Sequence, residues 1–380
     1  MTPRERFLEI AHFERTGDIF LPSNYQWFWH QTILRWVKEG APPQILSRDH
    51  RNEFFGFDRT EIIPIVSSLQ ALGKEGGPPY VPPLVPLFEP RVIEEDERIR
   101  VVIDESGTKC RVYKNEPERM PQWLQFPVKT RRDWQEYKKR LDPHMPTRFP
   151  AWWKDWVRCW RNRAYPLGLK VGSFFGLLRS FIGLENLSLM YYDDPVLIHE
   201  IGEWMEYFEL EIIKKVVRDV EVDFVYFWED MAYKTGSLVS PRIFREFMMP
   251  HYKKITQLLR RCGTDIILVD SDGDTTQLIP LWLEGGLSGH YPLEVAAGMD
   301  AVKLRKKYGN NLILLGNIDK RALIKGKRAI REEVTRKVPY LLSRGGYFPG
   351  VDHFVPPEVS YENYQYYLKL LREIAGIKQS

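Results

Sequence analysis

The stretch from residue 264 to residue 300 constrains the fold more than any other part of this sequence. An apolar run at 266–269 breaks into the acidic segment DSDGD, a helical pattern covers 275–284, and a second apolar run covers 287–291. Two β-type runs that flank one helix indicate a βαβ unit, which requires a parallel sheet. In such sheets the reactive groups lie beyond the carboxyl ends of the strands. We therefore expect Asp270, Asp272 and Glu294 to share one site.

The same rhythm repeats along the chain and predicts a (β/α)8 barrel, also called a TIM barrel, that forms a single domain over residues 1–380. A doubly wound open sheet is the alternative, but no glycine-rich phosphate fingerprint follows any strand. Helical patterns separate most of the strands, for example at 194–220, 241–261 and 329–343. The eight predicted strands cover residues 18–22, 62–66, 168–173, 222–228, 265–269, 287–291, 311–315 and 347–351.

Residues 88–114 have a different character, because polar and apolar side chains alternate there around short turns. This pattern is typical of an antiparallel β-meander rather than of a βαβ unit. Short helices are predicted to follow it. We therefore expect an inserted meander with helices at about 76–165, in the N-terminal half of the barrel.

The bulk composition excludes several classes of function. The 380 residues carry a formal net charge of only +4, which gives no support for nucleic-acid binding. Three cysteines without paired spacing favour a reducing compartment, and the charged N-terminal stretch is not a signal peptide, so we expect a cytoplasmic protein. No apolar run is long enough to span a membrane.

Polar side chains follow five successive predicted strands on one rim of the barrel. Carboxylates that lie close together raise one another's pKa, so a metal ion or a cationic substrate would relieve the crowding. Oxygen donors with one imidazole could hold a divalent metal. Helix capping is the alternative role for Asp272 and Asp274. The rim residues are Glu229, Asp230, Asp270, Asp272, Glu294, Asn317, Asp319, Asp352 and His353.

Aromatic side chains are the candidates for contact with a substrate. Tyr25, Trp27 and Trp29 follow the first predicted strand, where core packing is the alternative role. Phe174 and Asn317, which follow the third and seventh predicted strands, complete the predicted substrate-binding set.

Several motifs in a fixed order resemble the uroporphyrinogen decarboxylase superfamily, which contains that decarboxylase and cobalamin-dependent methyltransferases. They include VGSFFGLLRSFIGLENL, ILVDSDGD, PLEVAAGMD and GGYFPGVDHFVPPEVSYENY. The resemblance is strongest from residue 171 to the C-terminus and implies a divergent member with a (β/α)8 barrel.

The resemblance also implies a metal site. Methyltransferases of the superfamily bind zinc through a His-x-Cys pair, a later glutamate and a late cysteine. Those places are taken here by Asp270-Ser271-Asp272, by Glu294 and by Asp352-His353. The implied ligands of a divalent metal, with zinc as the first candidate, are Asp270, Asp272, Glu294 and His353.

The implied activity is that of an O-demethylase, in which the metal polarises a small donor, such as a methoxylated aromatic compound, and the methyl group passes to a corrinoid carried by a partner protein. Glu229 or Asp230 would orient the substrate or supply a proton, and His353 resembles a late histidine of the decarboxylase. Decarboxylation of a porphyrinogen or another carboxylate is one alternative, although the segment IFLPSNYQWFWHQ lacks the decarboxylase's arginine pair. A non-catalytic member that binds a ligand or a corrinoid is the other alternative. The oligomeric state, including a homodimer, stays open.

Overall fold

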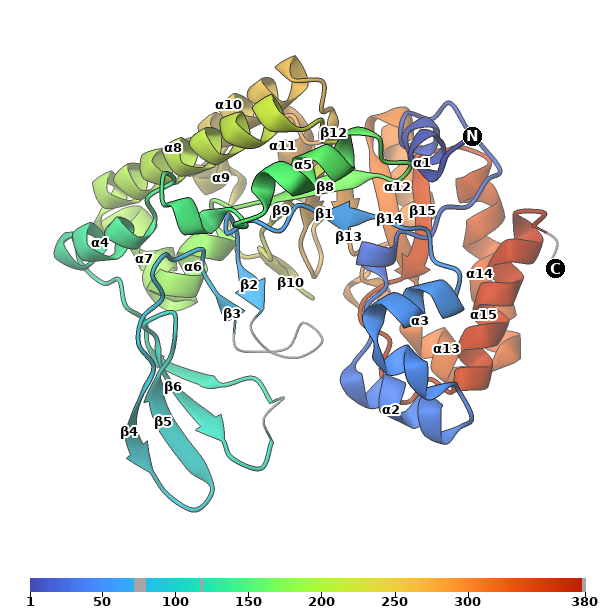
Figure 1. The fold of residues 1–380 in the computed structure, drawn as a ribbon, viewed down its shortest axis with the longest axis horizontal. Helices are drawn as coiled ribbons and strands as arrows, with labels where there is room; N and C mark the ends of the chain where they lie inside the picture. Colours follow the sequence, from blue (N-terminus) through green and yellow to red (C-terminus); the bar gives the residue numbers. More distant parts are fainter. Residues whose placement is uncertain (72–79, 117–118, 378–380) are drawn as a thin grey trace.

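The centre of the molecule is a curled sheet of seven parallel strands (Figure 1). The computed structural model describes residues 1–71, 80–116 and 119–377. All six pairings between neighbouring strands of the sheet are parallel, which confirms the βαβ character that the sequence predicts. In spatial order the strands are β1 (Glu61–Ile62), β8 (Leu167–Val171), β9 (Phe224–Trp228), β12 (Ile266–Asp270), β13 (Gly289–Tyr291), β14 (Ile313–Ile318) and β15 (Tyr347–Val351).

The first predicted strand, at residues 18–22, is wrong. Pro22 forms an isolated parallel bridge with Asp58, and the Leu21 N–H is donated to the Asp58 side chain at 2.7 Å. Pro22 has no N–H for a ladder, so the pairing stops there. The second predicted strand is reduced to β1, because Pro64 also lacks an N–H. A seven-stranded, barrel-like sheet is therefore established for the described residues, and eight-stranded closure is not.

Helices follow most of the central strands. The predicted helix at 241–261 divides into two at Met248, where Pro250 lacks the N–H that a continuous helix needs. None of the helices in the described ranges is long and apolar enough to cross a membrane. The α-helices are α1 (Pro3–Ala11), α2 (His30–Lys38), α3 (Arg48–Phe54), α4 (Arg131–Tyr137), α5 (Trp153–Arg161), α6 (Gly176–Ile182), α7 (Leu184–Asp193), α8 (Pro195–Asp219), α9 (Pro241–Phe247), α10 (Met249–Arg261), α11 (Ile279–Glu284), α12 (Ala301–Tyr308), α13 (Lys320–Lys325), α14 (Lys327–Leu342) and α15 (Tyr361–Ile374).

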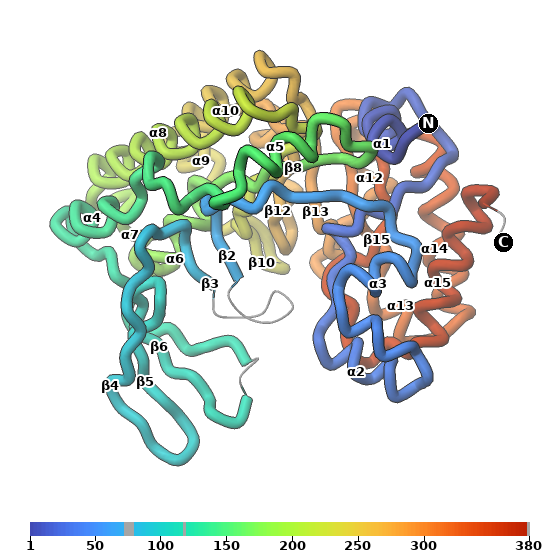
Figure 2. The backbone as a smooth tube through the Cα atoms, viewed as in Figure 1, coloured from blue at the N-terminus to red at the C-terminus, as the bar shows by residue number. Residues whose placement is uncertain are grey.

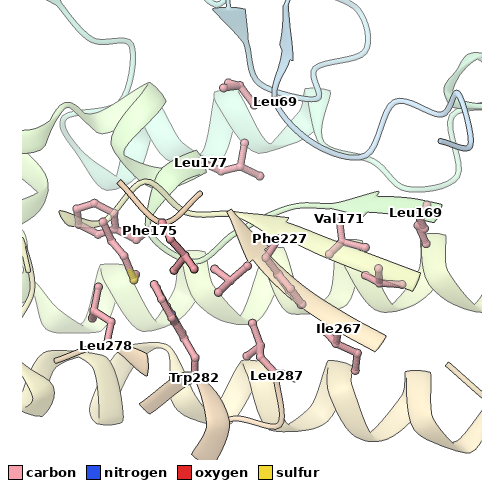
Figure 3. Packing of buried hydrophobic residues seen from close by; sticks show 14 of the residues in the cluster. Leu69, Leu169, Val171, Phe175, Leu177, Phe227, Ile267, Leu278, Trp282 and Leu287 are labelled. Carbon is pink, nitrogen blue, oxygen red and sulfur yellow. The ribbon is translucent and has the colours of Figure 1, made fainter. Parts of the chain in front are cut away.

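Alternate residues of the central strands face two separate apolar layers, as the pleat of a strand requires. The layer between sheet and helices contains Leu169 and Val171 of β8, Phe227 of β9 and Ile267 of β12 (Figure 3). The residues between them face the inside of the curled sheet, where Phe224, Leu268 and Leu315 belong to a second cluster. An odd or even position along a strand therefore decides which layer a side chain enters.

Helix α1 covers the amino ends of the strands. The Phe7 ring lies with its centroid 5.4 Å from that of Phe224 and 5.0 Å from that of Phe348, and both of these residues are near the starts of their strands. The Ile10 carbonyl accepts the Gly346 N–H at 2.8 Å. Because apolar side chains of α1 cover the amino ends of the strands, we expect the polar side chains of a functional site at the opposite, carboxyl ends.

A separate antiparallel sheet extends away from the rest of the molecule, on the side opposite α2 and α3 (Figure 2). It confirms antiparallel pairing in the region of the predicted meander. That this region is an insertion, starting near residue 76, stays a prediction, and residues 76–79 lie outside the described residues. The sheet contains β4 (Arg91–Glu95), β5 (Ile99–Ile103), β6 (Lys109–Tyr113) and β7 (Gln122–Gln125), and two short hairpins contain β2 (Gln70–Ala71) with β3 (Tyr80–Val81) and β10 (Ala232–Tyr233) with β11 (Gly236–Ser237).

Candidate functional site

The carboxyl ends of β9, β12, β13, β14 and β15 bring most of the predicted polar residues to one end of the curled sheet. Asp270, the last residue of β12, is in register with Trp228 of β9 and with Tyr291 of β13. The Asp270 carbonyl accepts the Glu229 N–H at 2.8 Å, so the two strand ends are joined directly. The rim that the sequence predicts is therefore a real neighbourhood, and the individual residues differ in what they contact.

Glu229 is fully enclosed and holds the backbone of the neighbouring loop. Its carboxylate accepts the N–H groups of Phe174, Phe175 and Gly176 at 3.1, 3.0 and 3.1 Å. It also accepts a hydrogen bond from the Tyr252 hydroxyl. Burial raises the pKa of Glu229 to about 7, although the backbone donors act in the opposite direction. These contacts are those of a residue that positions the start of α6, and its predicted catalytic role stays a prediction.

Asp230 and Glu294 are each paired with a cation of the protein itself. Arg179 Nη2 lies 2.9 Å from Asp230 Oδ2, and Lys320 Nζ lies 3.6 Å from Glu294 Oε1. Glu294 also accepts the N–H of Gly273 at 3.0 Å. Internal pairing therefore offers a physical answer to the crowding of acids that needs neither a metal nor a cationic substrate.

His353 forms the third such pair, with Asp272 at 3.3 Å between Nε2 and Oδ2. Burial opposes protonation of His353, but the hydrogen bond and the charge of Asp272 outweigh it, and the pKa of His353 is raised. The imidazole lies beside the rings of Trp27 and Phe354, at centroid distances of 6.3 and 5.1 Å. His353 is thus more readily protonated than an ordinary imidazole, and it lies at the edge of the aromatic residues.

The four predicted metal ligands are not arranged as a ligand set. Within the ranges 1–71, 80–116 and 119–377, no group of three or more His, Cys, Asp or Glu side chains is placed to hold a metal ion. His353 is engaged with Asp272, and Glu294 is engaged with Lys320. These residues do not fit a bound metal in this arrangement, so no step below passes through one. A divalent metal stays a prediction from the sequence.

Asp270 differs from the other acids because its carboxyl has no hydrogen bond or ion pair with any residue that the structure describes. Burial raises its pKa well above the ordinary value, and the charges of Asp272 and Asp230 act in the same direction, while Lys170 opposes them. A protonated carboxyl is a hydrogen-bond donor. Asp270 is therefore the rim acid that is free to act on a ligand.

Four aromatic rings gather on the inner side of the same strand ends. Ring centroids are 4.9 Å apart for Tyr25 and Trp27, and 5.2 Å apart for Tyr25 and Tyr291. Tyr291 lies 6.0 Å from both Trp27 and Tyr226. Tyr291 and Asp270 are register partners on neighbouring strands, so this set of four rings, which we call the aromatic set, adjoins the free acid.

The remaining predicted substrate-binding residues lie elsewhere. Trp29 is 41% exposed and packs against Phe354. Phe174 is buried behind the sheet, against His251 and Tyr252. The Asn317 side chain, at a residue with φ 71°, accepts the Ala301 N–H and donates to the carbonyls of Leu293 and Met299. Their predicted substrate contacts stay predictions without a supporting contact.

Sequence reasoning missed Lys170, Tyr226 and Tyr291. All three occupy inward-facing positions of strands that were correctly located. The strand LGLKV offers one signal, since Lys170 is a single charge in an otherwise apolar run. An alternation argument applied to every strand would have selected all three.

A cavity of about 310 Å³ lies at the antiparallel sheet, away from the carboxyl ends of the central strands. Its lining includes Tyr80, Val102, Cys110 and Trp123, and it shares no residue with the aromatic set. We give more weight to the carboxyl ends of the central strands as the candidate site, because the free acid and the aromatic set meet there.

Comparison with known proteins identifies relatives. The family model for uroporphyrinogen decarboxylase (URO-D) matches residues 98–374, which is more than half of the chain. The uroporphyrinogen decarboxylase of Thermus thermophilus is 27% identical over 151 residues, a match that covers 36% of this chain and 39% of that protein. The uroporphyrinogen decarboxylase of Xanthomonas axonopodis is 28% identical over 143 residues, a match that covers 34% of this chain and 37% of that protein. The chain thus spans less than two fifths of the length of these curated relatives.

A solved structure of a methyltransferase from Methanosarcina mazei resembles the whole chain. The TM-score is 0.57 at 13% sequence identity, and the match covers 98% of this chain and 99% of that one. At this identity the likeness supports a shared fold alone.

Proposed function

The chain belongs to the uroporphyrinogen decarboxylase family, and we propose that it is a methyltransferase of this superfamily that removes a methyl group from a small methoxylated aromatic donor. The observation that supports this proposal is the position of the aromatic set beside the free acid Asp270. Tyr25 and Tyr291 are buried and support the set from behind, whereas Trp27 and Tyr226 are only partly buried and offer ring surface on which another aromatic ring packs well. The proposed acceptor is a corrinoid carried by a partner protein.

The proposed reaction assigns separate roles to the rings and to the acid. The aromatic set, with Trp27 at its outer edge beside His353, orients the donor ring. The Asp270 carboxyl donates its proton to the ether oxygen while the bond between that oxygen and the methyl carbon breaks. The electron pair of the broken bond stays on the oxygen, the methyl group passes to the acceptor, and the donor leaves as a phenol. Asp270 then regains a proton from water.

Decarboxylation is the second candidate, and the sequence match to decarboxylases favours it. A tetrapyrrole with many carboxylates would require several cations without partners. Arg179 and Lys320 at this end are paired with Asp230 and Glu294, which favours a smaller substrate.

The test is a comparison of the two reactions on the same purified protein. Methoxybenzene derivatives are incubated with chemically reduced cobalamin as the acceptor, and phenol formation is followed by chromatography. In parallel, uroporphyrinogen is supplied and its decarboxylated products are measured. We expect phenol formation that depends on both protein and acceptor, and no enzyme-like turnover of uroporphyrinogen. Turnover of uroporphyrinogen without phenol formation would establish the second candidate in place of the first.

A further inference from the structure

Lys170 brings an amino group to the inside of the curled sheet. It lies on β8 between Leu169 and Val171, which both enter the layer between sheet and helices (Figure 3). Because side chains alternate along a strand, Lys170 points to the opposite, inner side. It is in register with Tyr226 of the aromatic set, and its ammonium lies 5.9 Å from the centroid of that ring.

The amino group of Lys170 forms no ion pair with any residue that the structure describes. It donates one hydrogen bond, to the Leu69 carbonyl at 2.9 Å. An ammonium has three donors, and no other residue of the described ranges accepts a hydrogen bond from it or forms an ion pair with it. Arg179 and Lys320 at the same end of the sheet each have a carboxylate partner. Burial lowers the pKa of Lys170 and the charge of Asp270 raises it, so an anion that binds beside the amino group favours the charged form of the side chain.

Asp270 does not supply that anion. The two side chains influence one another electrostatically, but no ion pair joins them. Lys170 is level with Tyr226, and Tyr226 is level with Leu268, two residues before Asp270. Strands β8 and β12 are two strand spacings apart, about 9.6 Å, and two residues along a strand add a rise of about 6.6 Å. The backbone positions that carry the two groups are therefore well separated, and a single ligand that spans them can contact both groups.

We propose that Lys170 is a specificity-determining residue that binds the carboxylate of the donor, so that the substrate class is the methoxylated aromatic acids. This inference rests on the proposed function, because it uses the same aromatic set for the ring. A charge-assisted hydrogen bond between the ammonium and the carboxylate fixes one end of the ring, and the ether oxygen lies at the other end, toward Asp270.

Arg48 is the natural comparison for Lys170. It lies at the start of α3, is exposed, and its charge lowers the pKa of Tyr226 in opposition to the dominant effect of burial. Water screens an exposed charge far more than an enclosed one. If the carboxylate is bound inside the sheet, Lys170 must control the preference for an acid much more strongly than Arg48 does.

The experiment measures binding without any methyl acceptor. Calorimetry compares 4-methoxybenzoate with its neutral isostere 4-methoxytoluene, on wild-type protein and on Lys170→Met and Arg48→Met variants. For the wild type we expect the acid to bind at least tenfold more tightly than the isostere. In Lys170→Met this preference falls to less than twofold, while the isostere binds as before. In Arg48→Met at least a third of the preference persists. Lys170→Gln replaces the methionine variant if thermal melts show that the latter does not fold.

Two results would overturn the proposal. One is a preference for the acid that survives in both Lys170 variants, and the other is a preference that disappears in Arg48→Met but not in Lys170→Met. These outcomes are distinct from a failure of the proposed function. If the acid preference depends on Lys170 but no donor yields a phenol, the binding role stands and methyl transfer is wrong. If neutral donors are demethylated and acids are not preferred, methyl transfer stands and the role of Lys170 is wrong.

Discussion

Glu229 and Asp270 lie at the ends of neighbouring strands and are joined through their backbones, yet their carboxyl groups have opposite surroundings. Three backbone N–H groups and the Tyr252 hydroxyl reach Glu229. No described residue donates to or pairs with the Asp270 carboxyl, which adjoins the aromatic set instead. Both acids have a raised pKa, so a raised pKa does not distinguish them. Their hydrogen-bond partners do: the satisfied acid positions the backbone, and the free acid is available to a ligand.

The largest effect is expected from Glu229→Gln. An amide keeps one acceptor oxygen but turns an NH2 group toward backbone N–H donors, which leaves several buried groups unsatisfied. We expect the free energy of unfolding to fall by about 3 kcal/mol, measured by urea denaturation. Tyr252→Phe, which removes one donor to the same carboxylate, serves as the control and should cost about 1 kcal/mol. A loss below that of the control would mean that Glu229 does not hold the loop.

Asp270→Asn should have the opposite effect to Glu229→Gln: stability stays nearly unchanged and activity falls. No hydrogen bond within the described protein is lost, so we expect the melting temperature to stay within about 2 °C of wild type. Phenol formation should fall about 100-fold or more, because the amide has no proton to transfer at the ether oxygen.

Asp272→Asn is the matched substitution, at an acid already paired with His353. We expect it to lose less than about tenfold in rate, since its carboxylate is assigned no proton transfer. Equal losses in the two variants would remove the distinction between a free and a paired acid.

The pH dependence of stability tests the Glu229 side of the comparison. Its pKa of about 7 lies above the ordinary 4.5, so the native state retains a proton that the unfolded state releases between these values. The stability linked to this proton is complete below the lower value and is lost as the pH rises through the higher one. The advantage of wild type over Glu229→Gln should therefore shrink by on the order of 2 kcal/mol between about pH 5 and pH 8. An advantage that grows with pH would show a carboxylate stabilised in its charged form.

Removal of metal should have the smallest effect of these changes, measured as donor binding at the aromatic set. The predicted ligands Asp272 and Glu294 already have partners in His353 and Lys320, so a chelator removes nothing on which donor binding depends. We expect the dissociation constant of 4-methoxybenzoate to change less than about twofold after dialysis against a chelator. A loss of binding that added zinc restores would favour the metal site that the sequence predicts.

The apolar runs of the parallel strands were sufficient to predict most of the fold, because buried parallel strands are near-continuous apolar segments. The same reasoning wrongly predicted a strand at residues 18–22, because the Leu21 N–H there is donated to the side chain of Asp58 and not to a neighbouring strand. In the candidate site, the placement of Asp270 and Asp272 at the carboxyl end of β12 followed from the chain rhythm. The ion pairs Arg179–Asp230 and Lys320–Glu294 could not be predicted from the chain rhythm, because the fold brings together residues that are far apart in the sequence.

The most direct test of the difference between the two acids is a crystal structure of the protein with 4-methoxybenzoate. We expect the ring to pack against Trp27 and Tyr226, with the ether oxygen within hydrogen-bond distance of Asp270 and the carboxylate at Lys170. Glu229 should keep its backbone partners unchanged. A ligand bound in the cavity of the antiparallel sheet, or one that contacts Asp272 and Glu294 and leaves Asp270 untouched, would contradict the assignment of Asp270 as the acid that acts on the substrate.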